Sequence, residues 1–256
     1  GIAGLALNPG RSGSWIYDNP GEVGYHTMAF SNNYLTVSAL IGMAQTNEEC
    51  MTVGTLRVPF ESSVMYSLVI NQKSTLDGYC GVGVANYSEN LQQYLGYSTY
   101  SIGYYDDGGV YINGSRLTTL APFVAGNVVD VVVNSYLKVV WFRADGGFWN
   151  NNDVADPTAN VGGYDISSLF AGNAAVSVGA APWYNSGDNT YDQIFIAPTS
   201  FYTVPTGYTF VPGVPNAGGQ GGDGASFWDA DNFAGIGGAG GGGGGRFKDS
   251  GTGGGG

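Results

Sequence analysis

The chain has 256 residues, of which 43% are apolar and 11% charged, and its 20 acidic against eight basic residues give a net charge of −12. This charge repels phosphate backbones and anionic membrane surfaces, so the composition argues against nucleic-acid binding. No apolar run approaches the roughly 18 residues of a membrane-spanning helix, so we expect no membrane insertion.

Apolar residues recur with a period of two, which is typical of strands. Along SVMYSLVIN, one face carries Val64, Tyr66, Leu68 and Ile70. NVVDVVVNS (127–135) and LKVVWFRA (137–144) predict two antiparallel strands joined by a tight turn. Further strands are expected at AAVSVGAA (174–181) and YDQIFIA (191–197), and the best helical candidate is the short SENLQQYLG (88–96). The pattern indicates an all-β domain of two packed antiparallel sheets.

Two adjacent carboxylates, Asp106 and Asp107, lie in GYYDDGGVYING (103–114), between strand-forming residues. Asp-Gly favours a type I′ hairpin turn, because glycine accepts a positive φ, and Asn113-Gly114 predicts a second such turn. A calcium loop requires further oxygen ligands at alternate positions, and these are absent. We interpret the pair as turn chemistry and neither as a metal site nor as a catalytic pair.

The sequence contains few residues suited to metal binding or to catalysis. Cys50, Cys80 and His26 are the only cysteines and histidine, whereas a structural zinc needs about four such ligands. We therefore expect no metal and no cofactor, and interpret His26 as a packed structural residue. The sequence leaves two alternatives open for the cysteines: a disulfide between Cys50 and Cys80, or two free buried thiols. The E-x-D-x-x-E strand of concanavalin-like glucanases is missing, so no catalytic residue is assigned.

A series of motifs in one order resembles the SPRY (B30.2-like) domain, in the divergent form found in phage and prophage proteins. The resemblance covers roughly residues 35–210. The matching segments are DGYCGVGVANYS (77–88), SIGYYDDGGVYING (101–114), AGNVVDVVVNSYLKVVWFRADGGFWNN (125–151), DPTANVGGYDISSL (156–169), AVSVGAA (175–181) and TGYTF (206–210). The sequence departs from the family pattern where Asp130 replaces a usual glycine.

The resemblance implies a concanavalin-like β-sandwich over residues 1–213, used for recognition without enzymatic activity. Its phage subset implies a virion structural protein. The first expectation is a tail-fibre or adhesin role in binding a host-surface glycan or protein, and the alternative is a capsid decoration or head-fibre subunit. A glycan-active enzyme is the remaining, disfavoured class. The resemblance also implies that Trp141, Phe142 and Phe148 face the core.

Aromatic residues near expected loops are candidates for the binding surface, since a tyrosine or tryptophan offers a flat apolar face with a polar tip. Amides beside them add hydrogen-bonding groups suited to a glycan. The candidates are Tyr94, Tyr97, Tyr104, Tyr105, Trp149, Asn151, Trp183 and Tyr184.

The C-terminal segment 214–256 differs in composition, with 19 glycines among the 39 residues from Gly218 to Gly256. Ordering glycine costs the most backbone entropy, and this segment has few side chains to bury in return. We therefore expect a non-regular assembly segment that contacts other virion proteins or further copies of the chain. Its expected anchor residues are Phe227, Trp228, Phe233 and Ile236.

Overall fold

The computed structural model describes residues 28–32, 35–39, 51–53, 58, 62–86, 93–173, 175–185, 187 and 189–213. All of them belong to the first of two compact units of the chain, Gly1–Pro215. The expected assembly segment 214–256 with its anchors, and also Cys50 and His26, lie outside the described residues.

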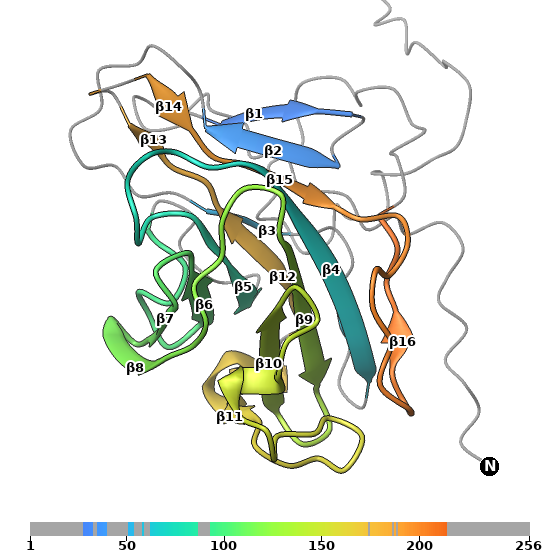
Figure 1. The fold of residues 1–256 in the computed structure, drawn as a ribbon. Helices are drawn as coiled ribbons and strands as arrows, with labels where there is room; N and C mark the ends of the chain where they lie inside the picture. Colours follow the sequence, from blue (N-terminus) through green and yellow to red (C-terminus); the bar gives the residue numbers. More distant parts are fainter. Residues whose placement is uncertain are drawn as a thin grey trace, which may run out of the picture. The chain divides into compact units, whose positions relative to one another are not determined.

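The larger sheet has eight strands and is antiparallel except at β16, which pairs in parallel with β4 (Figure 1). Its long central strands are β4 and β9, which pair over seven residues, and β10 continues the sheet from β9. The strands in spatial order are β1 (Met28–Ser31), β2 (Thr36–Ala39), β15 (Gln193–Ile196), β4 (Ser63–Gln72), β9 (Val128–Asn134), β10 (Val139–Ala144) and β11 (Tyr164–Asp165), with β16 (Thr209–Phe210) beside β4.

The smaller sheet has six antiparallel strands, and a separate two-stranded ribbon follows β12. In spatial order the six are β3 (Thr52–Val53), β12 (Val176–Ala181), β5 (Gly81–Asn86), β6 (Ser101–Tyr105), β7 (Gly109–Ile112) and β8 (Ser115–Thr119), and the ribbon is β13 (Tyr184–Asn185) with β14 (Thr190–Tyr191). Helical structure among the described residues consists of two short 3₁₀ segments, η1 (Trp149–Asn151) and η2 (Ser167–Asn173). The expected all-β antiparallel sandwich is confirmed.

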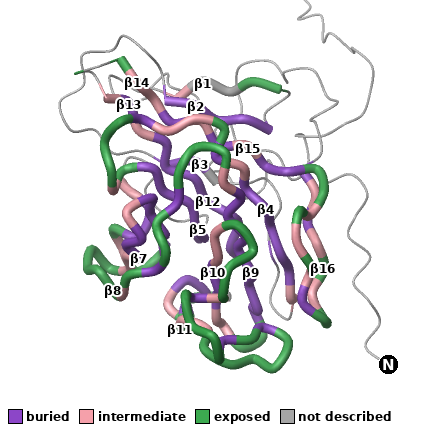
Figure 2. The backbone as a smooth tube through the Cα atoms, viewed as in Figure 1, coloured by how far each residue is buried: buried purple, intermediate pink, exposed green. Residues whose placement is uncertain are grey.

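The main core lies between the two sheets and is built by alternation along the strands. Val64, Tyr66, Leu68 and Ile70 of β4 all point into it, as the period of two predicts. The smaller sheet contributes the alternate residues of its own strands, among them Val82, Val84, Ile102, Tyr104 and Val178. Figure 2 shows the resulting burial along β4, β9 and β10, while exposed residues gather in the connections.

The outer face of the larger sheet carries a second, smaller apolar cluster. Trp141 of β10 packs there with Met65, Val132 and Ala155, and its indole N–H donates to the carbonyl of Val161. Phe142 points the other way, into the main core. The expectation that Phe148 faces the core is wrong: this side chain is 67% exposed, because the β10 strand has ended before it.

The outer face of the smaller sheet is rich in glycine for a steric reason. Leu95 is fully buried against this face, and a Cβ atom at Gly83 or Gly179 would lie 2.8 Å from its methyl groups. A Cβ at Gly103 would lie 2.4 Å from the backbone oxygen of Leu95. Gly83, Gly103 and Gly179 therefore make room for Leu95 and its connection, whereas Gly81 makes room for the ring of Tyr105.

This packing predicts a specific coupling between two positions. Gly179→Ala should lower the free energy of unfolding by about 1 to 3 kcal/mol, since the new methyl group meets the Leu95 side chain. In a Leu95→Ala background the same substitution should cost much less, because the clashing methyl groups are gone. Urea unfolding of the wild type, both single variants and the double variant measures this coupling energy. Additive effects would show that Leu95 does not rest on Gly179.

Candidate functional site

The Asp-Asp-Gly-Gly stretch forms the corner between β6 and β7, as expected, but with a different turn. The amide of Gly108 donates to the carbonyl of Tyr105, and only Gly108, with φ of 86°, adopts a positive φ in the loop 106–108. This is a three-residue hairpin loop closed by a left-handed glycine, and not the type I′ turn predicted for Asp-Gly. At the next corner Asn113 and Gly114 both have positive φ, as a type I′ turn requires.

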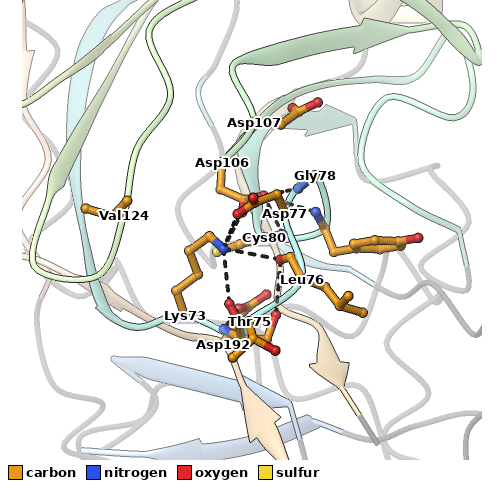
Figure 3. A network of polar contacts seen from close by, with 12 residues as sticks. Lys73, Thr75, Leu76, Asp77, Gly78, Cys80, Asp106, Asp107, Val124 and Asp192 are labelled. Carbon is orange, nitrogen blue, oxygen red and sulfur yellow. Dashed lines mark hydrogen bonds and ion pairs between the residues drawn. The ribbon is translucent and has the colours of Figure 1, made fainter. Parts of the chain in front are cut away.

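Asp106 does more than form a turn, because its carboxylate is fully buried. Oδ1 accepts hydrogen bonds from the backbone amides of Gly78, Tyr79 and Cys80, at 2.8, 3.0 and 3.1 Å. Oδ2 lies 2.9 Å from Nζ of Lys73 (Figure 3). The carboxylate thus ties the loop between β4 and β5 to the corner between β6 and β7.

Burial raises the pKa of Asp106, while Lys73 and the backbone donors partly offset this increase. Lys73 also lies 2.8 Å from Oδ1 of the exposed Asp77 and donates to the carbonyls of Ser74 and Leu76. One ammonium group therefore holds the whole loop 73–77 against Asp106.

Asp192 is a second buried carboxylate beside this loop (Figure 3). It accepts hydrogen bonds from the backbone amides of Ser74, at 2.6 Å, and Trp183, at 2.8 Å. Burial raises its pKa to about 6, and the neighbouring Asp106 charge adds to the increase. Cys80 next to it is a free, buried thiol whose pKa is also raised, mainly by burial. Cys50, with which Cys80 would form the disulfide considered above, lies outside the described residues.

A pocket of about 400 Å³ lies over the outer face of the smaller sheet, beside the β6–β7 corner. This volume is in the range of small-molecule binding sites, roughly 300–1,000 Å³. Its lining residues are Asp77, Gly78, Tyr79, Tyr94, Tyr105, Asp107, Tyr111, Ala181, Pro182 and Trp183. The network around Asp106 therefore shapes one wall of this pocket through the loop 77–79.

Aromatic rings dominate the pocket, and their mutual angles differ. Tyr111 stands nearly perpendicular to Tyr105, at 89°, and to Tyr94, at 86°. Tyr79 and Trp183 pack more face to face, with ring centroids 4.7 Å apart and planes at 31°. The rings come from β6, β7 and three connections, so the pocket is a joint product of the sheet and its loops.

Two carboxylates belong to the lining. Asp107 accepts a hydrogen bond from the amide of Gly109 and lies 3.4 Å from the guanidinium of Arg116, whose side chain is 43% exposed. Asp77 is paired with Lys73, as described above, and is 82% exposed. Lys and Arg side chains do not occur among the lining residues.

The structure brings three of the eight sequence candidates into this pocket: Tyr94, Tyr105 and Trp183. Tyr97 is 48% exposed and packs edge-on against Tyr94 next to it. The expectation of a surface position is wrong for Tyr104. Because side chains alternate along β6, Tyr104 points into the main core, where its hydroxyl donates to the carbonyl of Ala121. The same expectation is also wrong for Tyr184, which is buried and donates to Asn189.

The remaining candidates lie elsewhere. Trp149 packs under Arg143, whose guanidinium carbon is 4.0 Å from the ring centroid, on the outer side of the larger sheet. Arg143 in turn forms a 2.8 Å ion pair with buried Asp130, which also accepts a hydrogen bond from Ser67. The departure from glycine at position 130 thus has a structural role. Asn151 is exposed at the end of η1, with φ of 51°.

Sequence reasoning missed Tyr79, Tyr111, Asp77 and Asp107 as pocket residues. Tyr111 could have been found from its parity, since it alternates with the core residue Val110 and must face outward with Tyr105. Tyr79 and Asp77 reach the pocket only through the loop that Asp106 holds, a contact across 27 to 28 residues. No local pattern signals such a contact.

The described part of the chain contains no group of three or more His, Cys, Asp or Glu side chains that could hold a metal ion. The helices described there are also too short to cross a membrane.

The sequence matches no protein-family profile and no curated protein. Among solved structures, the chain is similar to the SPRY domain of human HERC1, with 15% identity and a TM-score of 0.48 over 67% of this chain and 92% of that chain. It is also similar to the PSpry domain of TRIM65, with 12% identity and a TM-score of 0.49 over 74% and 93% of the two chains. A further human SPRY domain has 12% identity and a TM-score of 0.42, over 68% and 96%.

The two neighbouring aspartates are expected to respond very differently to substitution by asparagine. Asp106→Asn should lower the free energy of unfolding by about 3 to 5 kcal/mol, because it leaves Lys73 without its buried partner and places an amide donor among backbone donors. Asp107→Asn should cost less than about 1 kcal/mol, since its ion pair is long and partly exposed. Chemical denaturation of both variants measures the difference, and equal losses would contradict the special role of Asp106.

The pKa of Asp192 predicts a pH dependence of stability. As the pH falls through about 6, the folded state takes up a proton that the unfolded chain binds only near its ordinary pKa of 3.8. The free energy of unfolding should therefore rise by about 1 kcal/mol through this group when the pH is lowered from 7 to 5. This gain in stability should disappear when the pH is raised again. Denaturation curves at both pH values test this, and Asp192→Asn should remove this part of the increase. An unchanged increase in that variant would assign it to other groups.

Proposed function

We propose that this chain is a non-catalytic recognition protein of a bacteriophage virion, which binds its ligand in the aromatic pocket on the smaller sheet. The observation that carries the proposal is the lining itself: five aromatic rings surround a pocket of about 400 Å³. Aromatic side chains offer a large contact area and lose little conformational entropy on binding, which is why they are frequent in binding surfaces. The buried network around Asp106 fixes the backbone of the loop that carries Tyr79 and Asp77, which favours a preformed binding site.

The carboxylates support binding over catalysis. Asp106 and Asp192, whose pKa values are raised, direct their oxygens at backbone amides and Lys73 and do not line the pocket. Of the two carboxylates that do, Asp77 is paired with Lys73 and Asp107 lies near Arg116. A glycosidase needs one carboxylic acid and one carboxylate free to act on the bond between them. A glycan-active enzyme is therefore disfavoured.

The virion assignment rests on the motif resemblance to phage-type SPRY domains and on the glycine-rich segment 214–256. We place the protein first in a tail fibre or adhesin, where the pocket would face the host surface. The alternative is a capsid decoration or head-fibre subunit, which the same assembly segment would serve. In both cases the partners are other virion proteins and further copies of this chain, with a glycan or protein of the host surface as ligand.

Binding to cells tests the recognition role. The fluorescently labelled chain should bind intact cells of some strains in a bacterial panel, and Tyr79→Ala should weaken that binding at least about tenfold, by loss of a pocket ring. Tyr136→Ala is the matched control, because Tyr136 is 64% exposed and lies in the turn between β9 and β10. Binding to no strain, or equal loss in both variants, would contradict the proposal.

Immunogold labelling of particles with an antibody against this chain separates the two placements. Label at the tail tip supports the tail-fibre role, and label over the head supports the decoration role. Absence of label from purified particles would overturn the virion assignment altogether.

A further inference from the structure

We propose that the aromatic pocket selects an alkylated ammonium group, of the kind that choline carries. This inference rests on the proposed recognition function and names the chemistry of the ligand. It draws on three features of the described residues: the charge of the lining, the angles between the rings, and a cation of this chain already seated beside them.

The charge around the pocket favours a cation. Asp77 and Asp107 belong to the lining, which contains no lysine or arginine. Directly behind the loop 77–80 lie two further carboxylates, Asp106 and Asp192, with Lys73 as the nearest balancing charge. The region around the pocket therefore contains these four carboxylates and two cations, Lys73 and Arg116, so the local potential is negative.

The rings of the lining do not lie in one plane. A sugar ring is usually held by stacking on one flat aromatic face, whereas a cation is attracted to several ring faces at once. Tyr111 meets the rings of Tyr105 and Tyr94 edge to face, at 89° and 86°, so the lining offers no single flat aromatic face. The Tyr79 and Trp183 pair adds further aromatic surface to the same lining.

One cation of the chain already lies beside a ring and a carboxylate of this lining. The guanidinium carbon of Arg116 lies 5.9 Å from the centroid of the Tyr111 ring, and the same group lies 3.4 Å from Asp107. A ring and a carboxylate thus act together on a partly exposed cation at the edge of the pocket. A ligand cation inside the pocket would meet the same ring and carboxylate, together with Tyr94, while the buried Tyr105 supports the Tyr111 ring from behind.

Alkylation of the ammonium group fits the largely aromatic lining. A primary ammonium is a compact, strongly hydrated charge with three donors that need acceptors. A quaternary ammonium has no donors and spreads its charge over methyl groups, so it loses less hydration on entering an aromatic site. The lining offers many ring carbons but only two carboxylates, which suits the second kind of cation.

Isothermal titration of the whole chain with choline and with 3,3-dimethyl-1-butanol tests the inference. The two molecules have the same shape, but only choline is charged. Choline should bind at least tenfold more tightly than its neutral counterpart. Tyr111→Leu, which keeps apolar bulk but removes the ring, and Asp107→Asn, which removes the charge, should each weaken choline binding at least fivefold. Tyr136→Leu is the matched control and should leave the affinity unchanged.

The outcomes separate this inference from the proposed function. Equal affinities for the two probes, or no choline binding by a folded chain, would overturn the cation preference. Binding of neutral monosaccharides such as galactose without choline binding would overturn it as well, and yet leave the pocket as a recognition site. Choline binding that Tyr111→Leu abolishes, combined with cell binding that Tyr79→Ala does not change, would uphold the cation site and overturn the proposed function.

Discussion

The pocket depends on one buried carboxylate. Asp106 gathers three backbone amides from the loop between β4 and β5 and the ammonium of Lys73 from the end of β4. A carboxylate without these partners would be too costly to bury, and the loop without the carboxylate would leave three donors unpaired. Each side therefore requires the other. Tyr79 and Asp77 line the pocket because their backbone is fixed by a residue of the opposite hairpin.

A second constraint is steric and acts on the other wall. Leu95 can lie flat on the smaller sheet only because Gly83, Gly103 and Gly179 carry no Cβ atom there. Leu95 anchors the connection that carries Tyr94. The backbone carbonyl of Leu95 also accepts a hydrogen bond from the hydroxyl of Tyr105. Glycine in a strand normally weakens the sheet, but here it lets a loop approach closely and build a wall. The pocket thus needs small residues in the sheet as much as large ones around it.

Local patterns predicted the sandwich well and the site only in part. The period of two along β4 and the Asn113-Gly114 turn depend on neighbours in sequence, so they could be read from the residues alone. Tyr104 and Tyr105 look equivalent in sequence, yet one fills the core and the other lines the pocket, because adjacent strand residues face opposite sides. The burial of Asp106 depends on partners 26 to 33 residues away, and no local pattern contains them.

The adjacent pair Asp106 and Asp107 shows how one turn serves two purposes. The first carboxylate turns inward, where backbone amides and Lys73 use its hydrogen-bonding capacity for stability. The second accepts a hydrogen bond from the amide of Gly109, and its other oxygen lies 3.4 Å from a partly exposed arginine, at the lining of the pocket. Because Lys73 lies 2.9 Å from the inner carboxylate and balances its charge, the negative potential at the lining comes from the excess of carboxylates over cations around the loop. One turn therefore supplies both the buried group that fixes the loop and a carboxylate at the lining of the pocket that this loop shapes.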